Sequence, residues 1–308
     1  MRILIELPTW LGDCVMSTPA IENIVRKFND CELVFIGSQV SIELMKSHPK
    51  CKETYILDRK LINLISTISS IKSIDLFISF RSSIRTKLLK LLLKTKIKYQ
   101  YNKNKFTSGH QVEKYNQFIK ESIGVDFKAK KLRLFKSFHQ YSSKMPRLGL
   151  NPGASYGSAK CWPFEKFVEV AVSLSGKFDI IIFGGPDEVD LSNKISQELR
   201  NKNCNNFTNL TGKTTIKDLM GYISSLDLFI TGDSGPMHIA AAFQITTVSI
   251  FGPTKVNETS QWMNTKSNIV KKDLDCQPCM KRVCPLGHHD CMKKISSKDV
   301  INSALSLI

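Results

Sequence analysis

The sequence contains no long hydrophobic segment. No apolar run among its 308 residues approaches the roughly 18 residues that a membrane-spanning helix requires. The opening stretch, Met1 to Glu6, carries an acid inside a short apolar run, which favours a first β-strand over a secretory signal. We therefore expect a cytoplasmic protein. Hydrophobic residues still make up 42% of the chain, enough for the cores of two domains of ordinary size.

Acidic residues are scarce relative to basic ones, and the imbalance is confined to one half. The chain has 44 Lys and Arg against 27 Asp and Glu, a net charge of +17. Residues 1–147 hold 27 of the basic and 12 of the acidic residues, and therefore +15 of this charge. Such a field attracts nucleic acid, an anionic membrane or an acidic substrate. Lysine-rich coding and solubility are the alternative explanation.

Apolar runs typical of buried strands alternate with segments of helical periodicity through both halves. Strands are expected at 2–7, 33–36, 54–57, 75–80, 97–101, 148–151, 179–183, 226–230 and 245–251. Helices are expected at 15–28, 40–46, 61–71, 83–94, 111–124, 164–175, 188–200, 216–225, 237–243 and 297–308. This alternation predicts α/β domains with parallel sheets covered by helices.

The alternation is interrupted once. Residues 128–147 are polar and end in Met145-Pro146-Arg147. We therefore expect an N-terminal domain at 1–147 and a C-terminal domain at 148–308.

Residues 226–243 have the strongest features of a ligand site. The apolar run at their start ends in a turn bracketed by Gly232 and Gly235, and a helix of small residues follows. Glycines let a ligand approach the backbone closely, and free N–H groups at a helix start suit a diphosphate. A second apolar run ends in Gly252-Pro253-Thr254. Two such strand–turn units indicate the ligand crevice of a doubly wound sheet, although a well-capped helix in any α/β domain is the alternative.

Motifs at both ends of the chain resemble one family. The string 233-DSGPMHIAAA-242, followed by 251-FGPT-254, is similar to the signature of the lipopolysaccharide heptosyltransferases, glycosyltransferase family 9. The opening 3-ILIELPTWLGDCVMSTPAIENI-24 resembles the amino-terminal signature of the same family, whereas residues 38–140 match it only weakly. The resemblance implies a GT-B fold, with two Rossmann-like domains whose parallel sheets face each other across a cleft. It also implies that the final helix, 297–308, packs back on the first domain.

The resemblance also implies the reaction. The family's members invert the anomeric centre as they transfer L-glycero-D-manno-heptose from ADP-heptose to the lipopolysaccharide inner core. A heptosyltransferase II acts on a heptose already present in that core. Heptosyltransferase I, or a family member that uses another nucleotide sugar, is the nearest alternative.

Two residues are predicted to be catalytic. Transfer to a hydroxyl needs a base, and the family assigns this role to the Asp of a Gly-Asp pair that Gly12 and Asp13 match. Capping of the following helix is the alternative for Asp13. Lys160 matches the family's Lys-x-Trp-Pro loop, which implies that its ammonium stabilises the departing diphosphate. A surface lysine before a helix is the alternative there.

The remaining donor contacts are also implied by the resemblance. Glu188 would accept hydrogen bonds from the ribose, although an acid in the first turn of a helix is favoured on its own account. Thr214, in the loop 212–215, would lie near the adenine. Asp233 would contact hydroxyls of the transferred sugar. The other donor-binding residues are Ser155, Ser234, Gly235 and His238, the last of which has core packing as its alternative.

The acceptor is assigned to the first domain. Trp10 and Gly12 lie beside Asp13, and Arg81 and Arg85 follow the strand at 75–80. Guanidinium groups suit carboxylates and phosphates, and the family's acceptor carries Kdo carboxylates and lipid A phosphates. We expect peripheral contact with the cytoplasmic face of the anionic inner membrane. A solvated helix face is the alternative for the two arginines.

Four of the nine cysteines are clustered. Cys276, Cys279, Cys284 and Cys291 form a C-x2-C-x4-C-x6-C pattern with His288 and His289 inside it. A zinc site is conceivable, although the spacing departs from paired C-x2-C knuckles, and disulfides are a poor default without a secretory signal. The tail resembles the heptosyltransferase II branch. Because Lys160 and the helix start would serve the diphosphate, we expect no metal and no cofactor besides the donor.

Two readings from other classes of protein compete with the transferase. The basic half and the cysteine cluster suggest a nucleic-acid-binding protein, and the cluster alone suggests a zinc-dependent interaction protein. No basic stretch interleaved with aromatic residues and no known nucleic-acid-binding module supports the first. We therefore expect no nucleic-acid partner.

Overall fold

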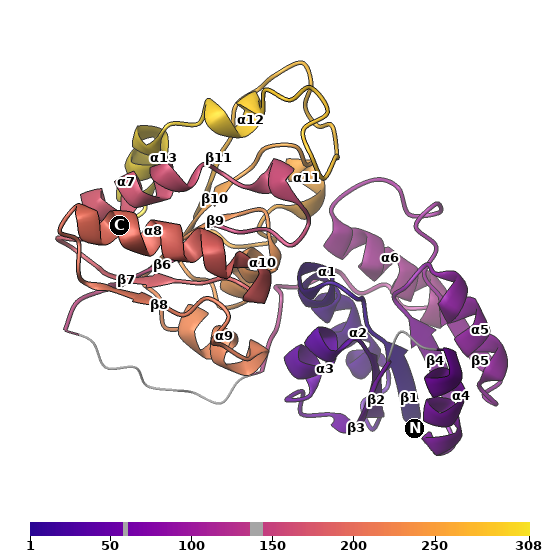
Figure 1. The fold of residues 1–308 in the computed structure, drawn as a ribbon. Helices are drawn as coiled ribbons and strands as arrows, with labels where there is room; N and C mark the ends of the chain where they lie inside the picture. The colour runs from indigo at the N-terminus through magenta and orange to yellow at the C-terminus, as the bar shows by residue number, and fades with distance from the viewer. Residues whose placement is uncertain (58–60, 136–143) are drawn as a thin grey trace. The chain divides into compact units, whose positions relative to one another are not determined.

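The structure is a computed structural model. It describes residues 1–57, 61–135 and 144–308. The chain divides into two compact units, Met1–Lys136 and Ser137–Ile308 (Figure 1). The domain boundary predicted after Arg147 lies further along the chain than this division. Residues 136–143 of the polar segment predicted at 128–147 lie outside the described residues.

The first unit is a five-stranded parallel sheet in the order β3-β2-β1-β4-β5. The strands are β1 (Arg2–Glu6), β2 (Glu32–Gly37), β3 (Cys51–Ile56), β4 (Leu76–Ser79) and β5 (Ile97–Gln100). The helices are α1 (Leu11–Met16), α2 (Thr18–Lys27), α3 (Gln39–Met45), α4 (Leu61–Ser70), α5 (Ile84–Leu92) and α6 (Gln111–Ile123).

The second unit is a six-stranded parallel sheet in the order β11-β10-β9-β6-β7-β8. Its strands are β6 (Arg147–Asn151), β7 (Asp179–Ile182), β8 (Phe207–Asn209), β9 (Leu228–Gly232), β10 (Thr247–Ile250) and β11 (Ser267–Val270). Its α-helices are α7 (Phe164–Leu174), α8 (Val189–Asn201), α9 (Ile216–Ile223), α10 (Gly235–Ala242), α11 (Val256–Thr259), α12 (Asp290–Lys293) and α13 (Ser297–Leu305). Two 3-10 turns are η1 (Ser158–Lys160) and η2 (Pro186–Glu188).

Both units follow one doubly wound plan. In each sheet the first strand lies in the middle, the next two extend to one side and the fourth begins the other side. The order therefore reverses between β1 and β4 in the first unit, and between β6 and β9 in the second. Doubly wound sheets bind ligands at the carboxyl ends of the strands beside such a reversal. The predicted α/β fold class is confirmed.

The cores are apolar because the central strands are buried along their whole length. Every residue of β6 and β9 is buried, and α7, α8 and α13 form a layer over one face of that sheet (Figure 1). In the first unit, side chains of α4 and α5 pack on the central strands. Parallel strands that are buried on both faces have near-continuous hydrophobic sequences, and these runs made the strands recognisable in the sequence.

Two expectations about elements need correction. The helix predicted at 15–28 is two helices, because Pro19 has no N–H to continue the hydrogen-bond ladder and the helices divide at Ser17. α13 buries Val300 and Ala304 in the core of the second unit, and its packing on the first domain stays a prediction. The short strands β8 and β11 were not predicted, because few and partly polar residues form them.

No helix in the described part of the chain is long and apolar enough to cross a bilayer.

The tight centre of the second sheet gives a first testable expectation. A Cβ atom at Gly149 would lie 2.4 Å from Cδ1 of Leu226 and 2.7 Å from Cδ2 of Phe229. Gly149→Ala should therefore lower the free energy of unfolding by about 1–3 kcal/mol, the usual cost of overpacking. Gly176→Ala is the control, because a Cβ there would meet nothing within 4 Å. Urea unfolding of both variants measures the difference, and equal stabilities would show that β6 can shift freely.

Candidate active site

A buried ion pair lies at the carboxyl edge of the second sheet. The Lys160 ammonium Nζ donates to Asp233 Oδ2 at 2.6 Å and to the Asp233 carbonyl oxygen at 3.1 Å. Thr254 Oγ1 donates to the same carboxylate oxygen at 2.6 Å. The side chains of Lys160 and Asp233 are only 12% and 5% exposed. The structure therefore brings together two predicted site residues and adds Thr254, which the sequence analysis had placed in a turn without a role.

Three neighbouring strands position this group. Lys160 ends η1 in the loop after β6, Asp233 follows β9, and Thr254 follows β10. Because β6, β9 and β10 are adjacent in the sheet, their carboxyl ends converge at one edge. The ring of Tyr156 lies 4.7 Å from Lys160 Nζ, a cation–π contact that further limits the position of the ammonium.

The N-terminus of α10 lies beside this group, and its N-cap residue makes no side-chain hydrogen bond to the first turn. Ser234 is the N-cap, but its side chain makes no capping hydrogen bond. Its hydroxyl instead lies 3.3 Å from Asn151 Nδ2 and 3.2 Å from Thr231 Oγ1. The contact between Asn151 and Ser234 joins β6 to β9 at the point where the strand order reverses. Pro236 has no N–H and the Met237 N–H donates to the Ser234 carbonyl at 3.2 Å, so among the first three residues of α10 it is the Gly235 N–H that suits an anion.

Glu188 lies in the loop after β7, at the same carboxyl edge of the sheet. Its Oε2 accepts a hydrogen bond from the Gly185 N–H at 2.6 Å, and burial raises the pKa of its carboxyl group. A Cβ atom at Gly153 would lie 2.0 Å from Glu188 Oε1, so a larger residue there would displace the Glu188 side chain. The carboxylate thus lies against the loop that leads to Lys160. Thr211 is buried nearby, and no hydrogen-bond partner for its Oγ1 is found among the described residues.

The other predicted donor residues lie at the same sheet edge with different exposure. Ser155 is exposed in the loop after β6, and Thr214 is half-buried in the loop after β8. That loop is tied to the β7 loop by the Gly212 N–H, which donates to the Gly184 carbonyl at 3.0 Å. Gly235 opens α10, and His238 is buried one turn further on. These placements agree with the predicted assignments and leave their roles as proposals.

In the first unit, Asp13 lies in the first turn of α1. The helix begins at Leu11 with Trp10 at its N-cap, so Asp13 is not the capping residue. Burial and then the nearby charge of Asp13 raise the pKa of Tyr115, which places the carboxylate close to α6. Trp10 is 53% exposed and Gly12 is half-buried.

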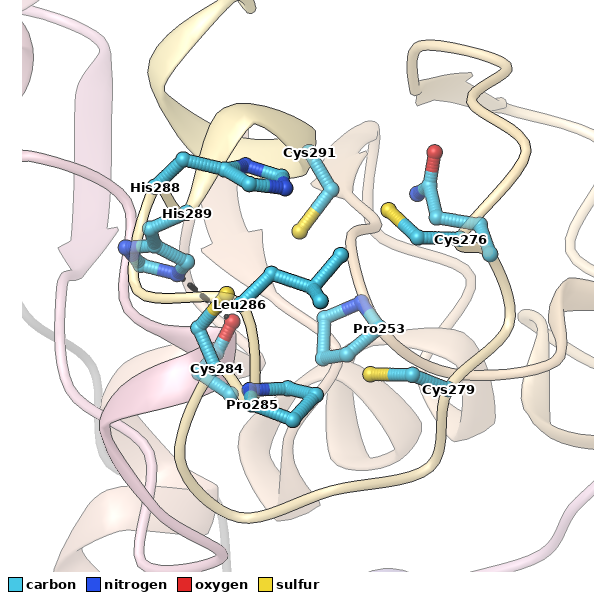
Figure 2. Close-up of a pocket in the computed structure, with 11 residues that line it drawn as sticks. Pro253, Cys276, Cys279, Cys284, Pro285, Leu286, His288, His289 and Cys291 are labelled. Carbon is cyan, nitrogen blue, oxygen red and sulfur yellow. Dashed lines mark hydrogen bonds between the residues drawn. The ribbon is translucent and has the colours of Figure 1, made fainter.

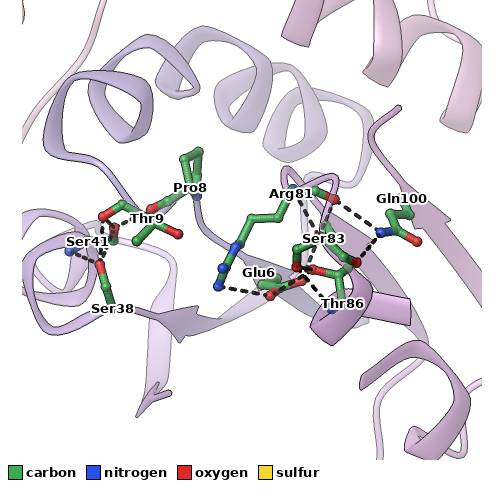
Figure 3. A network of polar contacts seen from close by, with 10 residues as sticks. Glu6, Pro8, Thr9, Ser38, Ser41, Arg81, Ser83, Thr86 and Gln100 are labelled. Carbon is green, nitrogen blue, oxygen red and sulfur yellow. Dashed lines mark hydrogen bonds and ion pairs between the residues drawn. The ribbon is translucent and has the colours of Figure 1, made fainter. Parts of the chain in front are cut away.

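The loop before α1 is held by α3. The Ser38 hydroxyl donates to the Thr9 carbonyl at 3.0 Å, and the Ser41 hydroxyl donates to the Pro8 carbonyl (Figure 3). Two hydroxyl groups thus satisfy backbone oxygens that no strand or helix serves. These hydrogen bonds fix the loop that connects β1 to the helix that carries Asp13.

A second buried carboxylate, Glu6, contacts one of the residues that are predicted to bind the acceptor. Glu6 Oε2 accepts from Ser79 Oγ at 2.6 Å, and Oε1 accepts from Thr86 Oγ1 at 3.2 Å and Arg81 Nη1 at 3.4 Å (Figure 3). Burial raises the pKa of Glu6, while Ser79 and Arg81 act in the opposite direction. In the sequence, this acid served only as evidence against a secretory signal peptide. An acid at the end of an otherwise apolar strand was the available signal.

The two predicted acceptor arginines differ in their surroundings. Glu6 holds the guanidinium of Arg81, and the Arg81 N–H donates to Ser79 Oγ at 3.1 Å. Arg85 lies close enough to Glu6 to lower the pKa of that carboxyl group. Its Nε and Nη2 atoms are shielded from water, and no hydrogen-bond acceptor for them is found among the described residues. The pair is therefore part of an organised cluster, which argues against a merely solvated helix face.

This arrangement of two doubly wound units with polar sites at their strand reversals is that of the GT-B glycosyltransferases. The fold matches E. coli ADP-heptose lipopolysaccharide heptosyltransferase II with a TM-score of 0.86 at 20% identity, over 100% of this chain and 98% of that one. It matches E. coli heptosyltransferase WaaC with ADP with a TM-score of 0.79 at 12% identity, over 100% of both chains.

Sequence comparison gives the family. The model of glycosyltransferase family 9 (heptosyltransferase) matches residues 67–289. The chain is 44% identical over 317 aligned residues to lipooligosaccharide heptosyltransferase 2 of Campylobacter jejuni, covering 100% of this chain and 98% of that protein. The chain therefore belongs to glycosyltransferase family 9 and is a heptosyltransferase, as its motifs predicted.

A double-mutant cycle tests the coupling of the buried pair. Lys160→Met and Asp233→Asn should each destabilise the protein, because each leaves the other group buried without its ionic partner. The double variant should lose less than the sum, with a coupling of at least about 1 kcal/mol in urea unfolding.

The matched control for this cycle is an ion pair in the same unit. Lys255 Nζ and Glu258 Oε1 are 2.9 Å apart, and the lysine side chain is 46% exposed. Its coupling, from Lys255→Met and Glu258→Gln, should stay below about 0.5 kcal/mol. Similar couplings for both pairs would mean that burial of the Lys160 pair carries no special energy.

Proposed function

We propose that the protein transfers L-glycero-D-manno-heptose from ADP-heptose to the heptose of the lipopolysaccharide inner core, with inversion at the anomeric carbon. The observation that carries this proposal is the buried group of Lys160, Asp233 and Thr254 beside the open start of α10. The full-length similarity to lipooligosaccharide heptosyltransferase 2 supports the choice of substrate. The reaction would take place at the cytoplasmic face of the inner membrane.

The donor would be held by the second unit. Its diphosphate would accept hydrogen bonds from Lys160 and from the Gly235 N–H at the start of α10. These cationic and N–H donors stabilise the charge that grows on the leaving ADP, so the donor site needs no metal ion. As the ammonium turns to the diphosphate, Asp233 becomes available to hydroxyls of the transferred heptose. Thr254 would keep its carboxylate in place.

The nucleoside end of the donor would meet the loops after β7 and β8. Glu188 is positioned to accept hydrogen bonds from the ribose hydroxyls, because only one of its oxygens is committed to the Gly185 N–H. Burial raises the pKa of this carboxyl group, and its ionised form accepts hydrogen bonds from hydroxyl groups. The loop 212–215, with Thr214, would lie against the adenine.

The acceptor would be held by the first unit. Asp13 would remove the proton from the attacking hydroxyl as that oxygen bonds to the anomeric carbon and ADP leaves from the opposite side. Arg85 has two shielded N–H donors that a carboxylate or phosphate of the acceptor would satisfy. The charge of +15 in residues 1–147 would attract the anionic glycolipid and the membrane surface.

The role of Asp13 can be separated from donor binding. Asp13→Asn should bind ADP-heptose with nearly normal affinity and lose about 10²–10⁴-fold in turnover, the usual contribution of a general base. Calorimetry gives the affinity, and mass gain of a purified core acceptor gives the rate. Asp30→Asn, at an exposed acid of the same unit, is the control and should behave as the parent does. A rate for Asp13→Asn within a few-fold of the parent would exclude the base assignment.

Salt should distinguish the two substrates. The Debye length is about 10 Å at 0.1 M salt, so added salt screens the long-range attraction of the basic unit for the glycolipid. The KM for the acceptor should therefore rise far more steeply with salt than the KM for ADP-heptose. Equal slopes would show that the basic half is only a solvated surface.

The two arginines should matter beyond their charge. Arg81→Gln/Arg85→Gln should raise the acceptor KM and leave donor affinity unchanged. Lys87→Gln/Lys94→Gln removes the same charge from exposed positions in and next to α5 and is the matched control. If both double variants raised the acceptor KM equally, the effect would come from net charge alone. The proposal that Arg81 and Arg85 form a local acceptor site would then be wrong.

A further inference from the structure

Four cysteines of one C-terminal segment line a single small cavity that the proposed reaction does not use. The cavity has a volume of about 20 Å³, and its walls include Cys276, Cys279, Cys284, Cys291, His288 and His289 (Figure 2). All four thiols are free of disulfides. The pattern that sequence analysis left open is therefore also a cluster in space.

The four cysteine side chains share this cavity with apolar groups such as Pro253 and Leu286 (Figure 2). Four cysteine thiolates are the ligand set of structural zinc sites and of mononuclear iron sites.

The turn between Cys284 and Cys291 is held by local hydrogen bonds. The Gly287 N–H donates to the Cys284 carbonyl at 3.3 Å, and the Asp290 N–H donates to His288 Nδ1 at 3.0 Å. Gly287 has a φ of 74° and His289 a φ of 58°, so the chain adopts left-handed backbone twice to form this turn. This local fold sets how Cys284 and Cys291 reach the same cavity.

The same segment holds both loops of the candidate active site. The Ala159 N–H donates to the Arg282 carbonyl at 3.0 Å, next to Lys160. Tyr156 Oη donates to the Met280 carbonyl at 2.8 Å. On the other side, the Met280 N–H donates to the Pro253 carbonyl at 2.9 Å, next to Thr254.

The fit between this segment and the Lys160 loop is also steric. A Cβ atom at Gly157 would lie 2.4 Å from the Arg282 carbonyl oxygen, so the loop can approach only because that residue is glycine. On the far side of the cavity, His289 Nε2 lies 2.9 Å from the Ala159 carbonyl oxygen. The position of the cysteine segment thus sets the position of the residues that directly precede Lys160.

We propose that Cys276, Cys279, Cys284 and Cys291 bind one thiophilic divalent cation, zinc or ferrous iron, which fixes this segment against the loops that carry Lys160 and Thr254. Each thiol that binds releases its proton, so the ion replaces protons and no electrons are transferred. Among the described residues, no three Cys, His, Asp or Glu side chains already stand at the mutual distances that an ion requires. Binding therefore requires the sulfurs to move inward by rotation about χ1, the single torsion that places each of them.

Metal content tests the site without reference to activity. Protein purified under reducing conditions and without a metal-affinity column should contain about one zinc or iron ion per chain by elemental analysis. Cys279→Ser and Cys284→Ser should lose that stoichiometric ion. Cys51→Ser and Cys204→Ser, which alter thiols outside the cluster, should retain it.

Cobalt provides a second readout that does not depend on how the variants fold. Protein stripped of metal by a chelator under reducing conditions should bind one Co²⁺ and develop thiolate-to-cobalt charge transfer with the strong visible bands of tetrahedral cobalt. The melting temperature of the parent should fall on stripping and recover when zinc or ferrous iron is restored. The Cys204→Ser control should behave in the same way as the parent.

Three results would overturn the proposal. The first is a reduced protein without stoichiometric metal and without a tetrahedral cobalt spectrum. The second is metal retained by Cys279→Ser and Cys284→Ser alike. The third is a pair of disulfides among the four cysteines in the freshly isolated protein, detected by alkylation and mass spectrometry. None of these bears on heptose transfer, so the site and the proposed function can fail separately.

Discussion

The salt bridge between Lys160 and Asp233 is the interaction on which the second unit's site depends. Removing two charges from water is costly, and their attraction repays that cost only when the geometry is good and other hydrogen bonds help. Thr254 supplies such a bond, and the Asp233 carbonyl supplies another. Because the members follow three different strands, the site forms only when those strands are in register.

The first unit uses a buried carboxylate in a different way. Glu6 is fully buried and is surrounded by two hydroxyl groups and one guanidinium. The ammonium of Lys160 can turn on a flexible stem from its carboxylate to another anion. By contrast, the guanidinium of Arg81 is a planar group with fixed donor directions, and it is held at the end of a rigid strand. The cation of the second unit can therefore reorient, whereas that of the first unit is held in a fixed direction.

Much of the fold followed from the sequence because the central strands are uniformly apolar. Buried runs such as β9 stand out, whereas β8 and β11 are short and partly polar and could not be distinguished from loops. The break between α1 and α2 required weighing Pro19 against a continuous periodicity. The sequence predicts an amphipathic helix at α13 but does not say which core buries Val300, which the structure places in the core of the second unit.

The candidate site was predictable where a motif carries it. Lys160 and Asp233 lie in glycine-rich turns that the resemblance to family 9 identified, so the structure added mainly their mutual contact. Thr254 and Glu6 were missed for a physical reason. A threonine after a proline and an acid at a strand end are ordinary residues until the sheet brings partners to them. The cysteine spacing was visible, but only the folded chain shows that all four thiols line one cavity.

The position of Glu6 also bears on how the chain assembles during synthesis. Its hydroxyl partners Ser79 and Thr86 lie 73 and 80 residues later in the chain. β1 is central in the sheet, so one of its edges stays unpaired until β4 leaves the ribosome. Until then the carboxylate can remain in water, and its desolvation is deferred to the step in which β4 docks. The acid thereby keeps an otherwise apolar edge strand hydrated during the interval in which it is most exposed to aggregation.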